Sequence, residues 1–318
     1  MNTTETAELN QPRDLAIDRL RGALVILMVA GDFLSGINWV PAFLKHAPDI
    51  GLTIADLVAP AFVFVIGLNF KASFRRHLRD GRMAAYRHFM MRYLSLLGIG
   101  AVISAGASLV DRPTGWGVLE ALGVAGLITL LAIRLPTWAR FLVGLLMLAG
   151  YQYALDTSML DKVLSSVHGG LFGALSWGAL LILSTAVADV WRSGTVRYLV
   201  CVGALFAAAG FSALVIPISK NRVSLSYILL TLAISALAFL IVKAFSNFRV
   251  LKAGIFCWWG QNSLALYFLH LLLLGLVGLP PIAWWYADAP AWLAALQLVA
   301  ILGLLSAVAW RIKPKSRT

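Results

Sequence analysis

The chain has 318 residues, of which 60% are hydrophobic and 13% are charged, and its formal net charge is +12. A soluble domain carries about 25% charged residues, so this composition excludes a protein that covers itself with polar surface in water. In lipid only helices and closed barrels satisfy their own backbone hydrogen bonds, and the apolar runs here have helix length without short alternation. The sequence therefore predicts an all-α fold, a polytopic membrane bundle.

The apolar runs predict about ten membrane-spanning helices, because a span needs about 20 mostly apolar residues. In chain order the predicted spans are 20–38, 52–70, 93–110, 117–135, 139–155, 170–191, 196–216, 225–243, 255–279 and 291–310. Residues 1–12 are expected to form a disordered lead-in. Residues 13–318 are expected to form a single transmembrane domain.

The positions of Lys and Arg predict the orientation, because cytoplasmic connections of membrane proteins are enriched in these residues. With the N-terminus inside, most of the 26 Lys and Arg residues fall in cytoplasmic connections, and both termini are cytoplasmic. The positive net charge is therefore explained by topology and predicts no nucleic-acid partner. The largest basic block, in the connection 71–92, contains Lys71, Arg75, Arg76, Arg79, Arg82, Arg87 and Arg92. Two interpretations of this block stay open: a loop on anionic lipid headgroups, or a patch for a phosphorylated cytoplasmic ligand.

Ionisable side chains inside spans are costly in lipid, so each one is a functional hypothesis. Asp32, Asp56, Glu120 and His270 all fall in the outer halves of predicted spans, and His46 lies in the outer loop before the second span. Asp56 and Glu120 have a structural alternative, because acids in the first turn of a helix cap its N–H groups. A buried histidine such as His270 can be satisfied by a backbone carbonyl. Asp32 has no helix terminus to cap, and we therefore expect it to be functional.

The ninth predicted span contains a polar stripe within the run GQNSLALYFLH. Asn262, Leu266 and His270 recur every fourth residue and are expected on one helix face, with Ser263 and Tyr267 beside it. Such a stripe either joins neighbouring helices by hydrogen bonds or lines a shaft filled by water or ligand. The five histidines show no metal-ligand spacing, so no metal site is predicted.

The stretch DRLRGALVILM, at the start of the first span, and the segment around His46 resemble the heparan-α-glucosaminide N-acetyltransferase family of membrane acyltransferases. The matching residues of that segment are His46, Ala47, Gly51, Leu52, Thr53, Asp56, Leu57, Val58 and Pro60. The runs PISKNRVSLSY and GQNSLALYFLH are similar to later segments of the family. Asp49 and Ala59 replace the aromatic residues that the family has after His-Ala and before the Pro.

The resemblance implies transfer of an acetyl group from cytoplasmic acetyl-CoA to a sugar or glycan amine or hydroxyl at the outer side of a bacterial inner membrane. The family's essential histidine maps onto His46, and its first-span asparagine corresponds approximately to Asp32. His46 is expected to act as general base, with Asp32 or Asp56 orienting the ring, or to form a covalent acetyl-imidazole. The candidate residues for binding the donor, including a group for its oxyanion, are Arg75, Arg76, Lys220, Asn262, Ser263, Tyr267 and His270.

Two other classes of function stay open from the residues alone. A proton-coupled transporter of a glycan precursor or small anion would also use buried carboxylates and histidines. An inactive relative that serves as a structural subunit is the third class, and a homodimer is one assembly that the sequence allows. Membrane lipid is an expected partner in every case.

Overall fold

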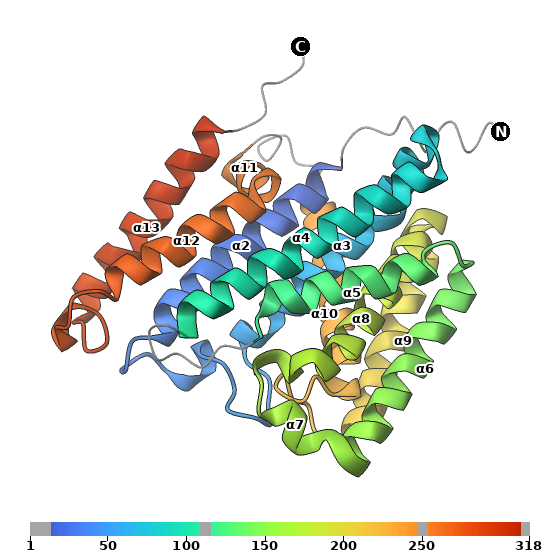
Figure 1. Ribbon diagram of the computed structural model, residues 1–318, viewed down its shortest axis with the longest axis horizontal. Coiled ribbons are helices and arrows are strands. Elements are labelled where there is room, and N and C mark those ends of the chain that lie inside the picture. Colours follow the sequence, from blue (N-terminus) through green and yellow to red (C-terminus); the bar gives the residue numbers. More distant parts are fainter. Residues whose placement is uncertain (1–13, 109–115, 247–253, 313–318) are drawn as a thin grey trace. The chain divides into compact units, whose positions relative to one another are not determined.

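A computed structural model describes residues 14–108, 116–246 and 254–312, and Figure 1 shows helices joined by loops, without strands, in these ranges. The predicted lead-in 1–12 and the last residues of the third predicted span lie outside them. The chain divides into two compact units. Unit 1 contains residues 48–52 and 59–237, and unit 2 contains residues 13–47, 53–58 and 238–318. The prediction of a single transmembrane domain over 13–318 stays a prediction.

Unit 1 is a bundle built around one buried helix, α8 (Gly170–Ser193), which contacts α5 (Val118–Ala132), α6 (Thr137–Ala154) and α9 (Thr195–Ala213). Side chains 179–183 of α8 have no solvent exposure, because small and apolar residues occupy its whole circumference. The other elements are most of α3 (Ile54–His77), η2 (Leu78–Asp80), α4 (Arg82–Ser108), the short π-helix η3 (Leu155–Met159), α7 (Leu160–Leu164), η4 (Val167–Gly169) and most of α10 (Leu225–Phe245).

Unit 2 combines helices from both ends of the chain. It contains α2 (Leu15–Ser35), η1 (Ala42–Leu44), α11 (Ile255–Gln261), α12 (Ser263–Val277), η6 (Ala283–Trp285) and α13 (Ala291–Arg311). Helix α2 contacts α11, α12 and α13. The contact of α2 with α11 is backbone to backbone: a Cβ on Gly22 would lie 1.9 Å from the Phe256 oxygen, and one on Gly260 would lie 1.8 Å from the Asp18 oxygen. Only glycine permits this approach, which is typical of packed membrane helices.

The ninth predicted span is not one straight helix. Helices α11 and α12 meet at Asn262 with a bend of 91°. The expected face that joins Asn262 to Leu266 and His270 therefore does not exist as a continuous stripe, because Asn262 lies at the break. The side-chain amide of Asn262 donates to the Trp258 oxygen at 2.9 Å, and the backbone carbonyl of Asn262 accepts from the Leu266 N–H at 3.0 Å. Asn262 thus satisfies backbone groups on both sides of the bend.

Each of the predicted spans overlaps a helix, but the helices are not equally suited to cross a bilayer. Six helices in the described ranges are long and apolar enough to do so, or seven if the bent pair α11–α12 counts as one span. Helix α5 has only 15 residues, and α2 carries Asp18, Arg19, Arg21 and Asp32. In the described ranges the regular structure of the protein is all helical, with several helices of membrane length.

Candidate active site

His46 and Asp56 form a hydrogen-bonded pair in unit 2. The Nδ1 atom of His46 lies 2.8 Å from Oδ1 of Asp56. The carboxylate of Asp56 is completely buried, whereas 43% of the His46 side chain is exposed. The second oxygen of Asp56, Oδ2, accepts from the N–H of Ala47 at 3.2 Å and from the N–H and hydroxyl of Thr53 at 3.1 and 2.9 Å. Both oxygens are engaged, so the carboxylate is held in one orientation.

The local sequence explains why this pair forms. Thr53 directly precedes helix α3, and Asp56 lies in the first turn of that helix. An acid three residues into a helix reaches back to the N–H of the capping residue, which is half of a capping box. The structural alternative for Asp56 is therefore also correct, because the same carboxylate that caps α3 holds the imidazole of His46. The short 3₁₀ helix η1 ends two residues before His46.

The arrangement fixes the chemistry of the His46 ring. An ionised carboxylate only accepts hydrogen bonds, so the Nδ1 atom of His46 carries the proton. The other ring nitrogen, Nε2, is then an unprotonated acceptor on the exposed side of the pair. A positioned imidazole with this tautomer and a carboxylate behind it can take a proton from an incoming nucleophile.

Asp32 does not orient His46 and instead contacts His270. The Nε2 atom of His270 lies 3.0 Å from Oδ2 of Asp32, between helices α12 and α2 of unit 2. His270 has no exposed surface, and its Nδ1 atom has no hydrogen-bond partner among the described residues. The ring of Tyr267 lies beside it, with the two centroids 5.1 Å apart. Unit 2 thus contains two separate histidine–carboxylate pairs.

The segment that follows His46 is fastened within unit 1 by Asp49. Arg222 donates through Nε to both Asp49 oxygens at 3.1 Å, and Ser219 donates its hydroxyl to Oδ1 at 2.8 Å. The Arg222 guanidinium holds the pKa of the Asp49 carboxyl below its usual value, although burial acts in the opposite direction. The N–H of Gly51 also donates to the Ile218 oxygen at 2.8 Å. The two segments that resemble the same family, around residues 48–51 and 218–222, are therefore bonded to each other.

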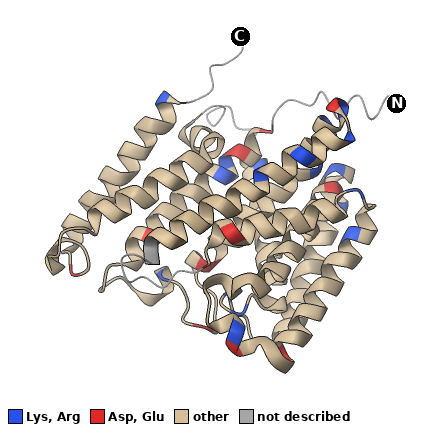
Figure 2. Cartoon of the chain, in the orientation of Figure 1, with Lys and Arg blue, Asp and Glu red and all other residues tan. Residues whose placement is uncertain are grey.

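The other expected residues are more dispersed. Lys220 is buried in unit 1, so its expected role beside His46 stays a prediction. Arg75 and Arg76 lie exposed in the last turn of α3, where the helix dipole favours cations. Ser263 begins α12 and is half-buried. Figure 2 shows many of the Lys and Arg residues of unit 1 gathered at the end where α3 and α8 finish and α4 and α6 begin.

Glu120 has the structural role that its position in the first turn of α5 predicted. Its Oε2 accepts from the Gly117 N–H at 3.0 Å, and its Oε1 accepts from the Ser104 hydroxyl at 2.7 Å. The carboxylate caps α5 and fastens it to α4. Among the described residues, no group of three or more His, Cys, Asp and Glu side chains is arranged to hold a metal ion.

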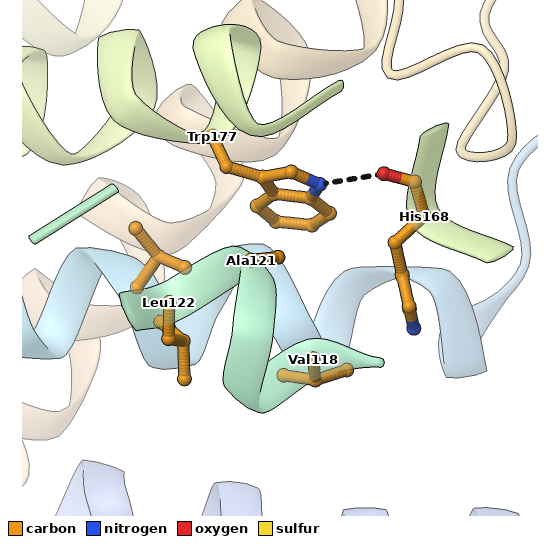
Figure 3. A pocket seen from close by; sticks show the side chains of 6 residues that line it. Val118, Ala121, Leu122, His168 and Trp177 are labelled. Carbon is orange, nitrogen blue, oxygen red and sulfur yellow. Dashed lines mark hydrogen bonds between the residues drawn. The ribbon is translucent and has the colours of Figure 1, made fainter. Parts of the chain in front are cut away.

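A small pocket in unit 1 contains none of the residues that the sequence singled out as candidates. Figure 3 shows it between α5 and the start of α8, lined by Val63, Val118, Ala121, Leu122, His168 and Trp177. Trp177 donates from its indole N–H to the His168 oxygen at 3.2 Å. His168 has a positive φ of 55°. The lining is almost wholly apolar, so this pocket is unsuited to phosphates or to a charged sugar.

Three groupings were not expected from the sequence: the Asp49–Arg222 pair, a cluster of cations around Asp189, and stacked rings of His77 and His88 with centroids 3.9 Å apart. The Asp49–Arg222 pair could have been anticipated from the sequence, since these are opposite charges in two loops that are predicted on the same side and that resemble one family. Asp189 could also have been noticed in the sequence, because it is the only acid in the predicted span 170–191.

Residues 13–170 match the family model described as heparan-alpha-glucosaminide N-acetyltransferase, catalytic. The chain is 33% identical to heparan-alpha-glucosaminide N-acetyltransferase of Homo sapiens over 120 residues, which are 36% of this chain and 18% of that protein. For the Mus musculus protein of the same name the identity is 32% over 128 residues, 38% of this chain and 19% of that protein.

The chain therefore spans less than a fifth of the length of the curated relatives that it matches. The family match includes both members of the His46–Asp56 pair, Asp32, and the arginines at the end of α3. The segments around Lys220 and His270 lie outside it. These matches confirm the family resemblance that the first-span stretch and the His46 segment indicated.

Proposed function

Residues 13–170 of this chain belong to the heparan-alpha-glucosaminide N-acetyltransferase family, and on that basis we propose that the protein is a multi-pass membrane acetyltransferase. It moves an acetyl group from acetyl-CoA to the amine or hydroxyl of a sugar or glycan. The observation that carries the proposal is the His46–Asp56 pair, in which a buried carboxylate holds a partly exposed imidazole at 2.8 Å.

His46 acts as the general base. Its Nε2 atom takes the proton of the acceptor as the acceptor nitrogen or oxygen attacks the thioester carbonyl, and CoA leaves as its thiol after it receives a proton. Asp56 stabilises the imidazolium formed in this step, because the carboxylate is already hydrogen-bonded to Nδ1. In the two-step version His46 attacks the thioester first and the acetyl-imidazole then acylates the acceptor. Both versions need the same tautomer of His46.

The membrane arrangement has both termini in the cytoplasm and about ten spans. Helix α3 supports it, because Asp56 lies in its first turn and Arg75 and Arg76 in its last turn. A helix of 24 residues is about 36 Å long, close to the ~30 Å hydrocarbon thickness of a bilayer. The basic turn then faces the cytoplasm, where the block of Lys and Arg is expected, and the His46–Asp56 pair faces the outer side. For a bacterial protein this is the inner membrane.

The donor enters from the cytoplasm with its nucleotide held outside and its thin pantetheine arm in the protein. Arg75 and Arg76 bind the nucleotide phosphates, since guanidinium groups donate paired hydrogen bonds to phosphate. Ser263 and Tyr267, near the start of α12, and the amide of Asn262 at the bend are the candidates for the arm. Lys220 is the candidate for the oxyanion.

A proton-coupled transporter remains a second candidate because of the Asp32–His270 pair. His270 is fully buried and bonded to a carboxylate that is 36% exposed, which suits a proton relay in a membrane protein. A transporter has no need to bind CoA and should instead accumulate solute. The two functions therefore differ in a simple binding measurement.

The test is calorimetric titration of the detergent-purified protein with acetyl-CoA. The proposal predicts saturable binding that His46→Ala retains and that the Arg75→Gln/Arg76→Gln double variant weakens by about tenfold. Arg197→Gln, which removes one exposed charge at the start of α9, is the control and should leave the affinity unchanged. If acetyl-CoA does not bind at millimolar concentration, the acetyltransferase proposal fails and the transporter hypothesis is preferred.

A further inference from the structure

One carboxylate in unit 1 serves three cations. Asp189, near the end of α8, accepts from the Lys71 ammonium at 2.5 Å and from the Arg140 guanidinium through the same oxygen, Oδ2. Its other oxygen lies 3.4 Å from Nη1 of Arg192. The Thr137 hydroxyl completes the shell of Oδ2 at 2.9 Å. The cluster therefore carries two more positive than negative charges.

This excess charge is largely withdrawn from water. Arg140 has no exposed surface, and the side chains of Lys71 and Asp189 are 17% and 16% exposed. A buried charge is costly unless it is compensated nearby. Arg75 raises the cost, since it repels both Lys71 and Arg140.

Backbone groups compensate only part of the excess. The carbonyls of Leu135 and Leu68 accept from Arg140 and Arg192 at 3.2 and 2.8 Å. Arg192 lies in the last turn of α8, whose C-terminal end contributes roughly half a negative charge, whereas α3 continues to His77, more than a turn beyond Lys71. More than one positive charge therefore remains without a counter-charge within the cluster.

Two members of the cluster can still reach a ligand. Within the part of the chain that the structure describes, the Lys71 ammonium makes one hydrogen bond, to Asp189, and an ammonium has three donors. Arg192 is 31% exposed and directs one guanidinium nitrogen to Asp189 and the other to Leu68. Arg140 makes four hydrogen bonds, to Leu135, Thr137, Thr185 and Asp189, and acts as the buried support.

We propose that Lys71 and Arg192, supported by Arg140 and Asp189, form a binding site for a phosphate group at the basic end of unit 1. Phosphate oxygens are strong acceptors for Lys and Arg donors, and a phosphate supplies the missing negative charge. The phosphate comes either from an anionic lipid headgroup or from a free nucleotide. The nucleotide source rests on the proposed use of acetyl-CoA, whereas the lipid source does not.

The experiment compares the full-length protein with the Lys71→Gln/Arg192→Gln double variant in phosphatidylcholine nanodiscs. Adenosine 3′,5′-bisphosphate is titrated by calorimetry in one arm. In the other arm, phosphatidylglycerol is included in the nanodiscs and the shift of the thermal unfolding midpoint is measured. Arg197→Gln is the matched control, since it removes an exposed positive charge next to the cluster in sequence but outside it.

At least one of the two probes should bind the wild type. The double variant should bind that probe at least about tenfold more weakly, whereas Arg197→Gln should bind it with nearly the wild-type affinity. Binding of the bisphosphate alone assigns a nucleotide, and a lipid-dependent shift alone assigns a headgroup. Equal responses of wild type and double variant, or an equal loss with Arg197→Gln, would overturn the proposal. If the double variant does not fold, Arg192→Gln alone replaces it, because Arg192 is the most exposed member. If the protein proves not to transfer acetyl groups, the lipid measurement still tests the phosphate site. The failure of the proposed function and the failure of the phosphate site can therefore be told apart.

Discussion

Replacing Asp56 by asparagine removes the charge behind His46 and keeps the shape of the side chain. Oδ2 of Asp56 accepts three hydrogen bonds, from the Ala47 N–H and from the N–H and hydroxyl of Thr53, whereas Oδ1 contacts the imidazole of His46. An amide NH₂ facing two backbone N–H groups would leave both without an acceptor, at about 1–3 kcal/mol each. The asparagine oxygen therefore takes the position of Oδ2, and its NH₂ faces His46.

The NH₂ group then donates to Nδ1 of His46, so the ring proton moves to Nε2 and the base is lost. We expect the rate of acetyl transfer to fall roughly 10²- to 10⁴-fold, the range that loss of a general base or of its tautomer costs in other enzymes. Stability should fall by about 1–3 kcal/mol, because one charge-assisted network becomes neutral. Single-turnover transfer and the thermal unfolding midpoint are measured together.

The matched control is Asp288→Asn, which removes an exposed carboxylate of unit 2 that accepts from the Asn38 amide at 2.7 Å. It should leave the transfer rate unchanged. A folded Asp56→Asn protein whose rate lies within about threefold of the wild type would refute the reasoning, because the His46 tautomer would then not matter.

The remaining predictions concern stability. Asp49→Asn should lower the free energy of unfolding by about 0.5–1 kcal/mol at pH 7, since the partly exposed ion pair with Arg222 is lost. Because the folded-state pKa of Asp49 is depressed, its contribution to stability is present above the usual pKa of about 3.9 and disappears as the pH falls through the lower folded-state pKa. The thermal unfolding midpoints of wild type and Asp49→Asn are compared at pH 7 and pH 3. The same difference between the two proteins at both pH values would contradict this prediction. Gly260→Ala should destabilise by about 3 kcal/mol or more, because its Cβ would lie 1.8 Å from the Asp18 oxygen. Gly275→Ala meets nothing within 4 Å and should be neutral or stabilising by about 0.5–1 kcal/mol in the same thermal assay.

The helical fold could be predicted from the sequence because hydropathy alone dictates it. Long apolar runs in lipid have to close their backbone hydrogen bonds within each segment, so the positions of the helices follow from composition. The break at Asn262 could not be predicted in this way. It accompanies the close packing of Gly260 on the backbone of α2, and this contact joins residues that are far apart in the chain. Periodicity assumes a straight helix and therefore placed Asn262 on the face of His270.

The two histidine–carboxylate pairs differ in how far apart their members lie in the sequence, and therefore in how well they could be predicted. His46 and Asp56 are ten residues apart, and a turn before a capped helix brings them together. Asp32 and His270 are separated by 238 residues, and only the packing of α12 on α2 makes them partners. The sequence placed both residues in outer halves of predicted spans but did not pair them with each other, and it gave Asp32 and Asp56 as alternative partners of His46. In the sequence, the cations around Asp189 are part of the charge pattern that predicts the orientation of the chain. That pattern does not indicate which cations share a carboxylate.

The most direct test of the account is acetyl transfer by the purified protein in proteoliposomes, with labelled acetyl-CoA on one side and a glucosamine-terminated acceptor on the other. The account predicts that the wild type and His88→Ala, a variant of an exposed histidine in the basic connection, transfer the label at equal rates. His46→Ala should bind acetyl-CoA, remain folded and transfer none of it. Substantial acetylation of the acceptor by His46→Ala would contradict the central claim.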